Sequence, residues 1–393
     1  MNPLSGKVIL VGVTGGISAY KIPFYVREIK KRGATVKVIL TENAKKFVSQ
    51  YVLSVLSDRV FESLWEESIP HISLTEEADL FVILPADYNI IGKAASGIAD
   101  DLLSSAIAAY NKELLLFPSM NTRMFENPVF RRNISYLKSC GHSVVDPAIG
   151  PLACEKKGKG RLPSVLRLVL ETEKALTPSF LDGAFCLITG GGTSEKIDPV
   201  RYLTNASSGK MAFSLAKNCY LAGGRVELIM GKNSVISDED IAYEVTRVET
   251  ARDMFEEIME RLKDVDYLFM SAAVSDFTVN RNEKKIKKEG ELVLKLKKNI
   301  DILKEIKKKK NKQFIVGFAL ESEDLEGSTL KKMKEKGCDL MVGNYPDSIG
   351  NENTAGVIIS SAGKEKFSCS KDELAWKIVG KINEDFNARK RNK

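Results

Sequence analysis

Residues 7–40 read KVILVGVTGGISAYKIPFYVREIKKRGATVKVIL and predict the fold class of the first half of the chain. Residues 7–13 and 35–41 are apolar runs with the length and composition of β-strands. Between them, apolar residues recur at the spacing of one helix face: Ile22, Val26 and Ile29. Gly33 then stands where a helix C-cap is expected. A strand, a helix and a second strand in this order predict a βαβ unit with parallel strands.

The same alternation of strand and helix patterns continues along the chain. In the first half, further strands are predicted at residues 79–84, 113–118 and 143–146. In the second half, strands are predicted at residues 185–190, 225–230, 266–272, 314–318 and 338–343, with a final hairpin of residues 356–360 and 366–368. The runs of the first half are apolar throughout, which is typical of strands that are covered by helices on both faces.

Residues 176–182 separate the two series and include Thr177-Pro178, a dipeptide typical of a linker. A chain of 393 residues is long enough for two or three domains. We therefore predict an α/β protein of two doubly wound domains, residues 1–175 and 183–393, joined by this linker.

The composition excludes several classes of protein. Hydrophobic residues make up 44% of the chain and charged residues 28%, as in globular proteins. The apolar runs are too short to cross a bilayer, and residues 1–7 lead into the first strand without a signal peptide. The six cysteines are scattered and form no CxxC pair, which argues against a disulfide framework or a zinc site. We expect a cytoplasmic protein that does not bind membranes.

The net charge of +7 is concentrated in a lysine-rich region at residues 284–312 and in the basic tail. A nucleic-acid-binding surface is expected to interleave basic and aromatic residues, whereas residues 307–310 are lysine alone. The charge pattern therefore favours a solvated surface. A basic nucleic-acid-binding protein stays open as an alternative, and steeply salt-dependent binding without flavin absorbance would favour it.

One glycine-rich turn follows the first strand of each half, at residues 12–19 and at residues 189–195. The turn with Thr14, Gly15 and Gly16 does not match GxGxxG, so a dinucleotide fingerprint is not supported. Backbone without Cβ atoms next to a helix N-terminus can still bind a phosphate, although a plain tight turn fits the pattern equally well. In the second half, Gly209-Lys210 fails the P-loop pattern because Thr204 stands where a glycine is required. Ser207 and Ser208, which precede this pair, are consistent with either a helix cap or an anion-binding site.

Several segments together resemble one enzyme family. In the first half they are residues 12–21 (GVTGGISAYK), His71, residues 118–121 (PSMN) and residues 153–161 (ACEKKGKGR), which resemble phosphopantothenoylcysteine decarboxylase. In the second half they are residues 198–211 (DPVRYLTNASSGKM), 271–277 (SAAVSDF), 285–288 (KIKK) and 317–319 (GFA), which resemble phosphopantothenate–cysteine ligase. Their order along nearly the whole chain is similar to that of the fused, bifunctional family of coenzyme A biosynthesis.

For the first half, the resemblance implies a flavodoxin-like domain that binds FMN. The phosphate of FMN would lie at Thr14, Gly15 and Gly16, and the flavin would be lined by Thr41, Pro85, Ala86 and Asp87. These residues lie at carboxyl ends of predicted parallel strands, where open sheets bind their ligands. The flavin would accept a hydride from the cysteinyl thiol and so provide the electron sink that decarboxylation needs.

The family also implies roles for single residues around that flavin. Cys154 would donate a proton, His71 would assist near the substrate carboxylate or thiol, and Asn121 would bind the carboxylate. Arg161 would belong to a substrate flap. This sequence departs from the family at Glu155-Lys156, where the family commonly has Gly-Asp after the cysteine. A ligase-active chain with an impaired decarboxylase is therefore an alternative.

For the second half, the resemblance implies a Rossmann-like ligase that uses CTP and a divalent cation, Mg²⁺ or Mn²⁺. The carboxylate of 4′-phosphopantothenate would become an acyl-cytidylate, which the cysteine amine then attacks. Lysines and the cation are expected around the α-phosphate, where charge develops. No residue of the sequence is assigned as a metal ligand.

The residues that the resemblance assigns to the ligase site fall into three groups. Those that would contact the nucleotide are Met270, Ser271, Ala272, Asp276, Lys285, Asn299, Asp301, Ile302, Phe318, Lys332 and Lys336. Those that would bind phosphopantothenate are Gly191, Gly192, Ser207 and Ser208. Asn205 would stabilise the acyl-cytidylate. The family's Asn-Pro-Asp-Ile loop reads Asn299-Ile300-Asp301-Ile302 here, which leaves the choice of nucleotide open.

The family forms homo-oligomers, with trimers of decarboxylase domains and dimers of ligase domains that combine into a dodecamer. The resemblance implies such an assembly for this chain. Within enzymes, a flavin prenyltransferase is a further alternative for residues 1–175, since its fold shares the opening turn. That alternative does not account for His71 with Cys154, nor for the ligase-like second half.

Overall fold

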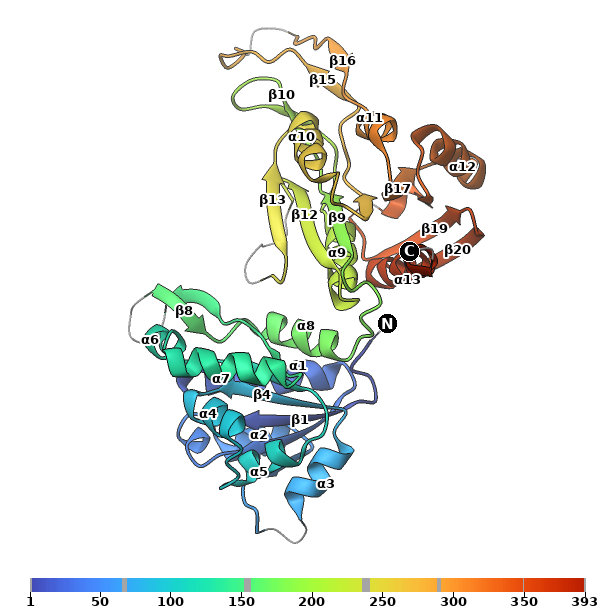
Figure 1. The fold of residues 1–393 in the computed structure, drawn as a ribbon. Helices are drawn as coiled ribbons and strands as arrows, with labels where there is room; N and C mark the ends of the chain where they lie inside the picture. The colour runs from blue at the N-terminus through green and yellow to red at the C-terminus, as the bar shows by residue number, and fades with distance from the viewer. Residues whose placement is uncertain are drawn as a thin grey trace. The chain divides into compact units, whose positions relative to one another are not determined.

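The computed structural model describes residues 2–65, 69–151, 157–234, 241–287, 291–348 and 350–391. The chain divides into two compact units, Asn2–Pro178 and Ser179–Lys393, referred to below as the N-terminal and C-terminal units. Figure 1 shows that each unit has a sheet with helices packed on it. Among the described residues, no helix is both long and apolar enough to cross a membrane.

The N-terminal unit is built on a six-stranded sheet of order β3-β2-β1-β4-β5-β6, and every neighbouring pair is parallel. The strands are β1 (Val8–Val13), β2 (Thr35–Leu40), β3 (Arg59–Phe61), β4 (Leu80–Ala86), β5 (Leu114–Pro118) and β6 (Ser143–Val144). Apart from the short edge strand β3, this is the flavodoxin-like order. The predicted βαβ unit is confirmed, and Gly33 has the positive φ of 82° that a helix C-cap requires.

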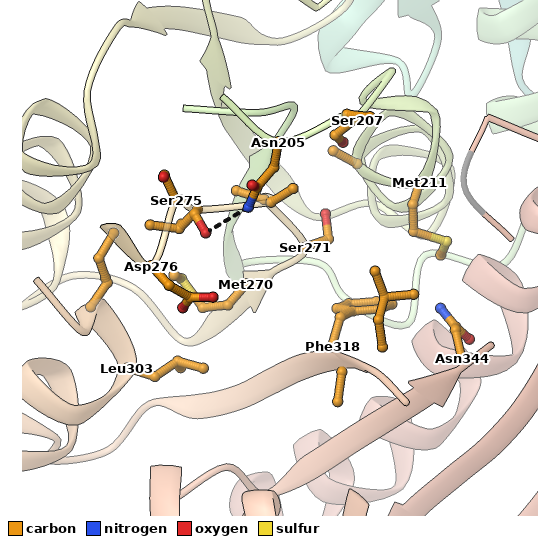
Figure 2. A pocket seen from close by; sticks show the side chains of 18 of the residues that line it. Asn205, Ser207, Met211, Met270, Ser271, Ser275, Asp276, Leu303, Phe318 and Asn344 are labelled. Atoms are coloured by element: carbon orange, nitrogen blue, oxygen red, sulfur yellow. Dashed lines mark hydrogen bonds between the residues drawn. The ribbon is translucent and has the colours of Figure 1, made fainter. Parts of the chain in front are cut away.

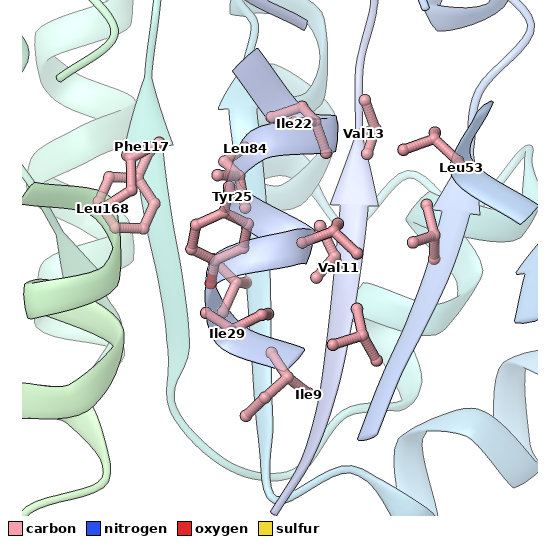
Figure 3. Close-up of a cluster of buried hydrophobic side chains, with 14 of the residues drawn as sticks. Ile9, Val11, Val13, Ile22, Tyr25, Ile29, Leu53, Leu84, Phe117 and Leu168 are labelled. Carbon is pink, nitrogen blue, oxygen red and sulfur yellow. The ribbon is translucent and has the colours of Figure 1, made fainter. Parts of the chain in front are cut away.

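Helices cover both faces of this sheet. One face carries α1 (Ile22–Lys31), α2 (Gln50–Leu56) and α8 (Val165–Ala175), and the other carries α3 (Pro70–Glu77), α4 (Tyr88–Ser96), α5 (Leu102–Ala109) and α7 (Pro128–Ser139). In Figure 3, Ile22, Tyr25 and Ile29 of α1 lie against Val11 and Leu84 of the strands. Each such aliphatic side chain contributes about 1.5–3 kcal/mol when buried, which explains why strands apolar on both faces are placed centrally.

The C-terminal unit has an eight-stranded sheet of order β13-β12-β9-β14-β17-β18-β19-β20. The strands are β9 (Phe185–Gly190), β12 (Arg225–Gly231), β13 (Glu244–Val248), β14 (Tyr267–Met270), β17 (Phe314–Leu320), β18 (Leu340–Asn344), β19 (Asn353–Ser360) and β20 (Gly363–Ser370). The first six strands in this order, β13 to β18, are parallel and have the doubly wound order, while β19 is antiparallel to both β18 and β20. The predicted terminal hairpin is β19–β20.

Two groups of helices cover this second sheet. One face carries α9 (Lys210–Leu221) and α13 (Lys371–Arg391), and the other carries α10 (Ala251–Arg261), α11 (Ile302–Lys309) and α12 (Leu325–Lys336). Leu181 is fully buried in the core under α9 and α13, and its backbone N–H donates to the Ala222 carbonyl over 2.8 Å. The ring of Phe180 lies 5.9 Å from that of Trp376. Residues 180 and 181 therefore pack as part of the C-terminal unit.

The described residues form three small two-stranded sheets outside the main sheets. They are β7 (Ala148–Pro151) with β8 (Lys157–Arg161), β10 (Ser194–Lys196) with β11 (Tyr202–Thr204), and β15 (Phe277–Val279) with β16 (Leu296–Lys298). Each one follows or precedes a loop at the carboxyl end of a main-sheet strand. They carry much of the site architecture described next.

Candidate functional site

The first candidate site is the carboxyl edge of β1 and β4, here called the β1–β4 edge. The chain leaves these neighbouring strands towards opposite sides of the sheet, which is where doubly wound sheets bind ligands. Thr14 follows β1 and is only 2% exposed. Its hydroxyl donates to the Pro85 carbonyl over 2.7 Å and accepts from the Asp87 backbone N–H over 3.1 Å. Thr14 therefore joins the ends of β1 and β4.

The glycines after Thr14 differ in their surroundings. A Cβ atom on Gly15 would lie 2.5 Å from Cβ of Asn43, so a glycine is needed where the turn meets the loop after β2. At Gly16 the nearest atom to such a Cβ is 3.9 Å away, and the residue is partly exposed. Thr41 donates its hydroxyl to the Val13 carbonyl over 3.1 Å. The backbone at Gly15 and Gly16 is thus the accessible part of the turn.

Four segments that are far apart in the sequence meet at this edge. The hydroxyl groups of Ser18 and Ser119 are 2.7 Å apart and share a hydrogen bond. The Ser119 backbone N–H donates to the Ala86 carbonyl over 3.1 Å, and the next N–H, of Met120, donates to the Gly160 carbonyl over 3.0 Å. The first turn, β4, the loop after β5 and β8 are therefore linked into one surface.

Glycines allow β8 to lie directly on the loop after β5. A Cβ atom on Gly160 would be 2.1 Å from the Met120 carbonyl oxygen, and one on Gly158 would be 2.3 Å from the hydroxyl oxygen of Thr122. Gly160 also has a φ of 145°, which favours glycine. Asn121 caps α6 (Thr122–Phe125), because its side-chain oxygen accepts from the Arg123 backbone N–H over 2.9 Å.

The predicted catalytic residues of the first half have different outcomes. Cys154, with Glu155 and Lys156, lies outside the described residues. Arg161 is exposed at the end of β8, and its side chain lies beside Gly150 of β7. His71 lies at the start of α3, and no hydrogen bond among the described residues links it to the β1–β4 edge. Its Nδ1 atom is buried and has no hydrogen-bond partner within the described part of the chain.

Asp87 combines a structural role with an unusual electrostatic environment. Its side chain caps α4 by accepting from the Ile90 backbone N–H over 2.8 Å. Burial raises the pKa of Asp87, although the hydrogen bond from the Ile90 backbone N–H opposes the rise. A partly buried carboxyl group at the strand end offers a hydrogen-bonding group to a ligand of the edge.

Replacing Thr14 by valine is expected to destabilise the N-terminal unit by about 1–3 kcal/mol. The isosteric side chain removes the hydroxyl and leaves the Pro85 carbonyl and the Asp87 N–H buried without their partner. Scanning calorimetry of the full chain should show a lower transition for this unit only. Thr14→Ser keeps the hydroxyl and should stay near the wild type. Equal transitions for valine and wild type would show that the link does not stabilise the edge.

The second candidate site is a cavity of about 750 Å³ at the carboxyl ends of β9, β14 and β17. It lies at the switch point of the C-terminal sheet, between β9 and β14. Figure 2 shows Asn205, Ser271 and Phe318 directed into the same space, with Asp276 and Leu303 towards one side and Met211 and Asn344 towards the other. Polar and apolar side chains therefore alternate along the lining of the cavity.

Most of the ligase residues predicted from the sequence line this cavity. They are Asn205, Ser207, Ser208, Met270, Ser271, Ala272, Asp276, Asn299, Asp301, Ile302, Phe318, Lys332 and Lys336. Asn205 donates its side-chain N–H to the Val274 carbonyl over 3.1 Å, which positions the amide at the end of β14. The side chain of Asn299 donates to Glu195 and to the Ser275 carbonyl, both over 3.0 Å. These bonds orient side chains that come from separate segments.

Gly191 and Gly192 do not line the cavity. A Cβ atom on Gly192 would lie 2.5 Å from the Asn205 carbonyl oxygen, and Gly191 has a φ of 72°. The Gly191 carbonyl accepts from the Ala273 N–H over 2.8 Å. In the described structure these glycines allow the backbone of the Asn205 loop to approach β9. They therefore determine the position of a loop that lines the cavity, without lining it themselves.

Lys285 does not line the cavity either, and it is exposed in the loop after β15. The residue after it is held in place by Asp198, which is fully buried. Asp198 accepts from the Ile286 N–H over 3.2 Å and from the Arg201 guanidinium over 2.7 Å. The Ile286 carbonyl accepts from the same guanidinium over 3.2 Å. The Asp198–Arg201 pair therefore anchors the loop that carries Lys285.

Replacing Asp198 by asparagine is expected to destabilise the C-terminal unit at pH 7 and much less in acid. Burial alone would raise the pKa of Asp198, but backbone hydrogen bonds and the Arg201 charge hold it below the ordinary 3.8. A carboxyl group with a lowered pKa stabilises the fold above pH 3.8, and this contribution is lost as the pH falls through the folded-state value.

The two tryptophans allow this to be measured, because Trp65 and Trp376 lie in different units. In a Trp65→Phe background, Trp376 fluorescence reports urea unfolding of the C-terminal unit alone. The difference in unfolding free energy between the chain with Asp198 and the Asp198→Asn variant should narrow as the pH is lowered from about 7 to about 3. A difference that is constant with pH would contradict the assignment.

Both predicted lysines of α12 have acidic partners, of which Asp301 also lines the cavity. Lys332 pairs with Glu321 over 2.6 Å, and Lys336 pairs with Asp301. Burial opposes ionisation of Asp301, but Lys336 and the Lys304 N–H together lower its pKa. An anionic ligand would compete with Glu321 and Asp301 for these ammonium groups.

Comparison with known proteins decides the family. The family model described as Flavoprotein matches residues 2–177, and that of the DNA/pantothenate metabolism flavoprotein C-terminal domain matches residues 181–386. The coenzyme A biosynthesis bifunctional protein CoaBC of Bacillus subtilis is 39% identical over 351 residues, covering 87% of this chain and 86% of that protein. The chain belongs to the CoaBC family.

Other CoaBC proteins match over a still larger share of the chain. That of Borreliella burgdorferi is 34% identical over 386 residues, covering 95% of this chain and 98% of its own. A crystal structure of the C-terminal domain of a CoaBC protein is 31% identical, with a TM-score of 0.46, and covers 53% of this chain and 99% of that one.

Several residues around the two sites were not predicted. Ser18 and Ser119 occur in the quoted motifs of the CoaBC resemblance but were not assigned to the site. Asn344 lines the cavity, and its side-chain oxygen is buried without a hydrogen-bond partner in the described part of the chain. Lys371 lines the same cavity. No local sequence pattern distinguishes these residues, because the order of the strands in each sheet places them at their sites. Within the described residues, no cluster of three or more His, Cys, Asp or Glu side chains could hold a metal.

Proposed function

We propose that this chain carries out two successive steps of coenzyme A biosynthesis. The C-terminal unit, Ser179–Lys393, ligates cysteine to 4′-phosphopantothenate with CTP. The N-terminal unit, Asn2–Pro178, decarboxylates the product to 4′-phosphopantetheine. The observation that carries the proposal is the 750 Å³ cavity with lysines in its wall, at the switch point of the sheet in a CoaBC chain.

The ligation needs an activated carboxylate. A carboxylate oxygen attacks the α-phosphorus of CTP, pyrophosphate leaves, and the resulting acyl-cytidylate is attacked by the cysteine amine with release of CMP and a proton. The ammonium groups of Lys332 and Lys336 would bind the phosphates, and the Asn205 amide would donate to oxygens that gain charge. Phe318 and Met270 would pack against the base, and Asp276 would accept from the ribose.

We further propose that Mg²⁺ or Mn²⁺ enters with the triphosphate. Mg²⁺ is commonly bound through substrate phosphates together with one or two carboxylates. Asp276 and Asp301 are the carboxylates among the residues of the cavity wall. We also assign Lys285 to binding of the phosphates. It lies in the loop that Asp198 anchors.

The β1–β4 edge fits FMN in the character of its groups. The accessible backbone at Gly15 and Gly16 would hold the phosphate, and Thr41, Pro85, Ala86 and Asp87 would surround the ring. When bound, FMN supplies a reversible electron acceptor for the cysteinyl thiol. Asn121 would bind the substrate carboxylate, and Arg161 would close over the substrate. Cys154 and His71 are assigned to proton transfer, so that loss of carbon dioxide is balanced by uptake of one proton.

The proposal extends to the assembly and the location of the chain. We propose a cytoplasmic homo-oligomer with dimeric ligase and trimeric decarboxylase contacts. The second candidate function is an active ligase with an impaired decarboxylase, because Glu155-Lys156 replaces the family's Gly-Asp. Among the described residues, no feature of the two sites indicates binding of a nucleic acid.

The test is to supply the purified chain with 4′-phosphopantothenate, cysteine, Mg²⁺ and either CTP or ATP, and to follow products by mass spectrometry. The proposal expects 4′-phosphopantetheine with CTP and a yellow, flavin-absorbing protein. Phosphopantothenoylcysteine alone would support the ligase and reject the decarboxylase. Neither product with either nucleotide would reject the proposed function.

A further inference from the structure

Lys371 is a buried lysine in the wall of the C-terminal cavity. It is the first residue of α13, lines the cavity and is 9% exposed. Its backbone N–H donates to the Glu352 carbonyl over 3.0 Å. Within the described part of the chain, its ammonium group has no hydrogen bond or ion pair.

The other lysines of the cavity wall are different. Lys332 and Lys336 are paired with Glu321 and Asp301, and Lys210 is paired with Glu352. Lys304 also pairs with Asp301, and Lys298 is exposed to solvent. Burial of an ammonium group without a counter-charge is unfavourable. Burial lowers the pKa of Lys371, and the nearby charge of Lys210 lowers it further, against the opposing charge of Glu352. The site around Lys371 is therefore short of one negative charge.

The carboxylate near Lys371 is that of Glu352, which pairs with Lys210 and does not line the cavity. The carboxylates of the cavity wall, Asp276 and Asp301, belong to the β14 loop and the start of α11. The segment before α9, with Ser207 and Ser208, and the segment with Gly350 and Thr354 contribute hydroxyl and backbone groups to the same wall as Lys371. The N-terminus of the 21-residue helix α13 adds its dipole.

We propose that Lys371 is a binding residue for the phosphate monoester of 4′-phosphopantothenate, an inference that rests on the proposed ligase function. A phosphate dianion supplies the charge that Lys371 lacks and accepts from the neighbouring hydroxyl groups. Phe318 lies between Asp276 and the side of the cavity with Met211 and Asn344 (Figure 2), and the phosphate would occupy the latter side. The carboxylate of the same substrate then reaches towards Asn205, while the nucleotide occupies the end with Lys332 and Lys336.

Replacing Lys371 by methionine tests the proposal. Calorimetric titration without nucleotide should show binding of 4′-phosphopantothenate weakened about 10- to 100-fold, as for loss of one charged hydrogen bond. Binding of pantothenate, which lacks the phosphate, should change less than about twofold. Binding of CTP should also change less than about twofold, which separates the two phosphate sources. Lys371→Arg should recover part of the affinity for the phosphorylated ligand.

The thermal stability provides an independent readout. Since methionine removes an unpaired buried charge, the C-terminal unit should melt about 2 °C or more above the wild type. Lys377→Met is the matched control, because Lys377 lies on the same helix, is 45% exposed and pairs with Glu365. It should leave both binding and melting unchanged.

The outcomes separate this inference from the proposed function. If wild type forms phosphopantothenoylcysteine but Lys371→Met binds 4′-phosphopantothenate as tightly as wild type, the inference is wrong and the ligase stands. Equal weakening for phosphorylated and unphosphorylated ligands would assign Lys371 a structural role and also overturn it. If wild type forms no product, the proposed function fails, and the titration still decides whether Lys371 recognises the phosphate.

Discussion

Replacing Asn205 by aspartate is expected to lower the kcat of ligation by about 10³-fold. The Asn205 amide donates to the Val274 carbonyl over 3.1 Å and lines the cavity. An aspartate oxygen in its place would face that carbonyl as a second acceptor, so the side chain would lose its anchor. Removal of one donor to a developing oxyanion alone costs about 10²–10³-fold, and the added negative charge repels the phosphates.

The measurement is pyrophosphate release with CTP, 4′-phosphopantothenate and cysteine. Asn311→Asp is the matched control, because it makes the same change of charge at an exposed residue of the same unit outside the cavity. Decarboxylation of supplied phosphopantothenoylcysteine should be unaffected in both variants. A kcat within threefold of the wild type for Asn205→Asp would remove Asn205 from the reaction.

Replacing Gly160 by alanine is expected to lower decarboxylation by more than about 100-fold while leaving ligation intact. The added methyl group would lie 2.1 Å from the Met120 carbonyl oxygen, and this backbone atom cannot move aside as a flexible side chain can. β8 would have to separate from the loop that carries Ser119 and Asn121. A displacement of about 1 Å in a substrate-positioning segment is enough for a 10²-fold loss.

Gly97→Ala is the control for backbone strain without a clash. Gly97 has a φ of 69°, and no atom lies within 4 Å of a Cβ built there. It should cost about 1 kcal/mol of stability and leave both activities near the wild type. Carbon dioxide release from phosphopantothenoylcysteine is the measurement. If Gly160→Ala decarboxylates as fast as Gly97→Ala, the contact between β8 and the β5 loop does not serve the reaction.

The central strands were predictable because their burial on two faces leaves an unbroken apolar run. β1, β4 and β9 are such strands, and their positions fix the two switch points. The edge strand β13 was not predicted, because its sequence EVTRV is partly exposed and carries charges. β16, with the sequence LKK, is fully exposed and has no apolar face to be recognised. Strands of this kind form through pairing with a neighbour rather than through burial.

The sites could be predicted only in part. Pro85, Ala86 and Asp87 follow from the rule that ligands bind at the carboxyl ends of strands. The link from Ser18 through Ser119 to the β5 loop depends on sheet order, which local sequence does not contain. Lys371 stands in the charged sequence SCSKDEL, where a lysine looks like any solvated one. Its burial results from the packing of α13 beside α9, a contact between segments about 150 residues apart.

The burial of Leu181 has a practical consequence for dividing this chain into halves. A C-terminal half that starts at residue 183 lacks the side chain that fills the space beneath α9, and it lacks the partner ring of Trp376. Loss of a buried leucine typically costs about 2–5 kcal/mol, a large fraction of what holds a domain together. Expression of the ligase half on its own should therefore yield soluble protein only when the cut is made at or before Ser179.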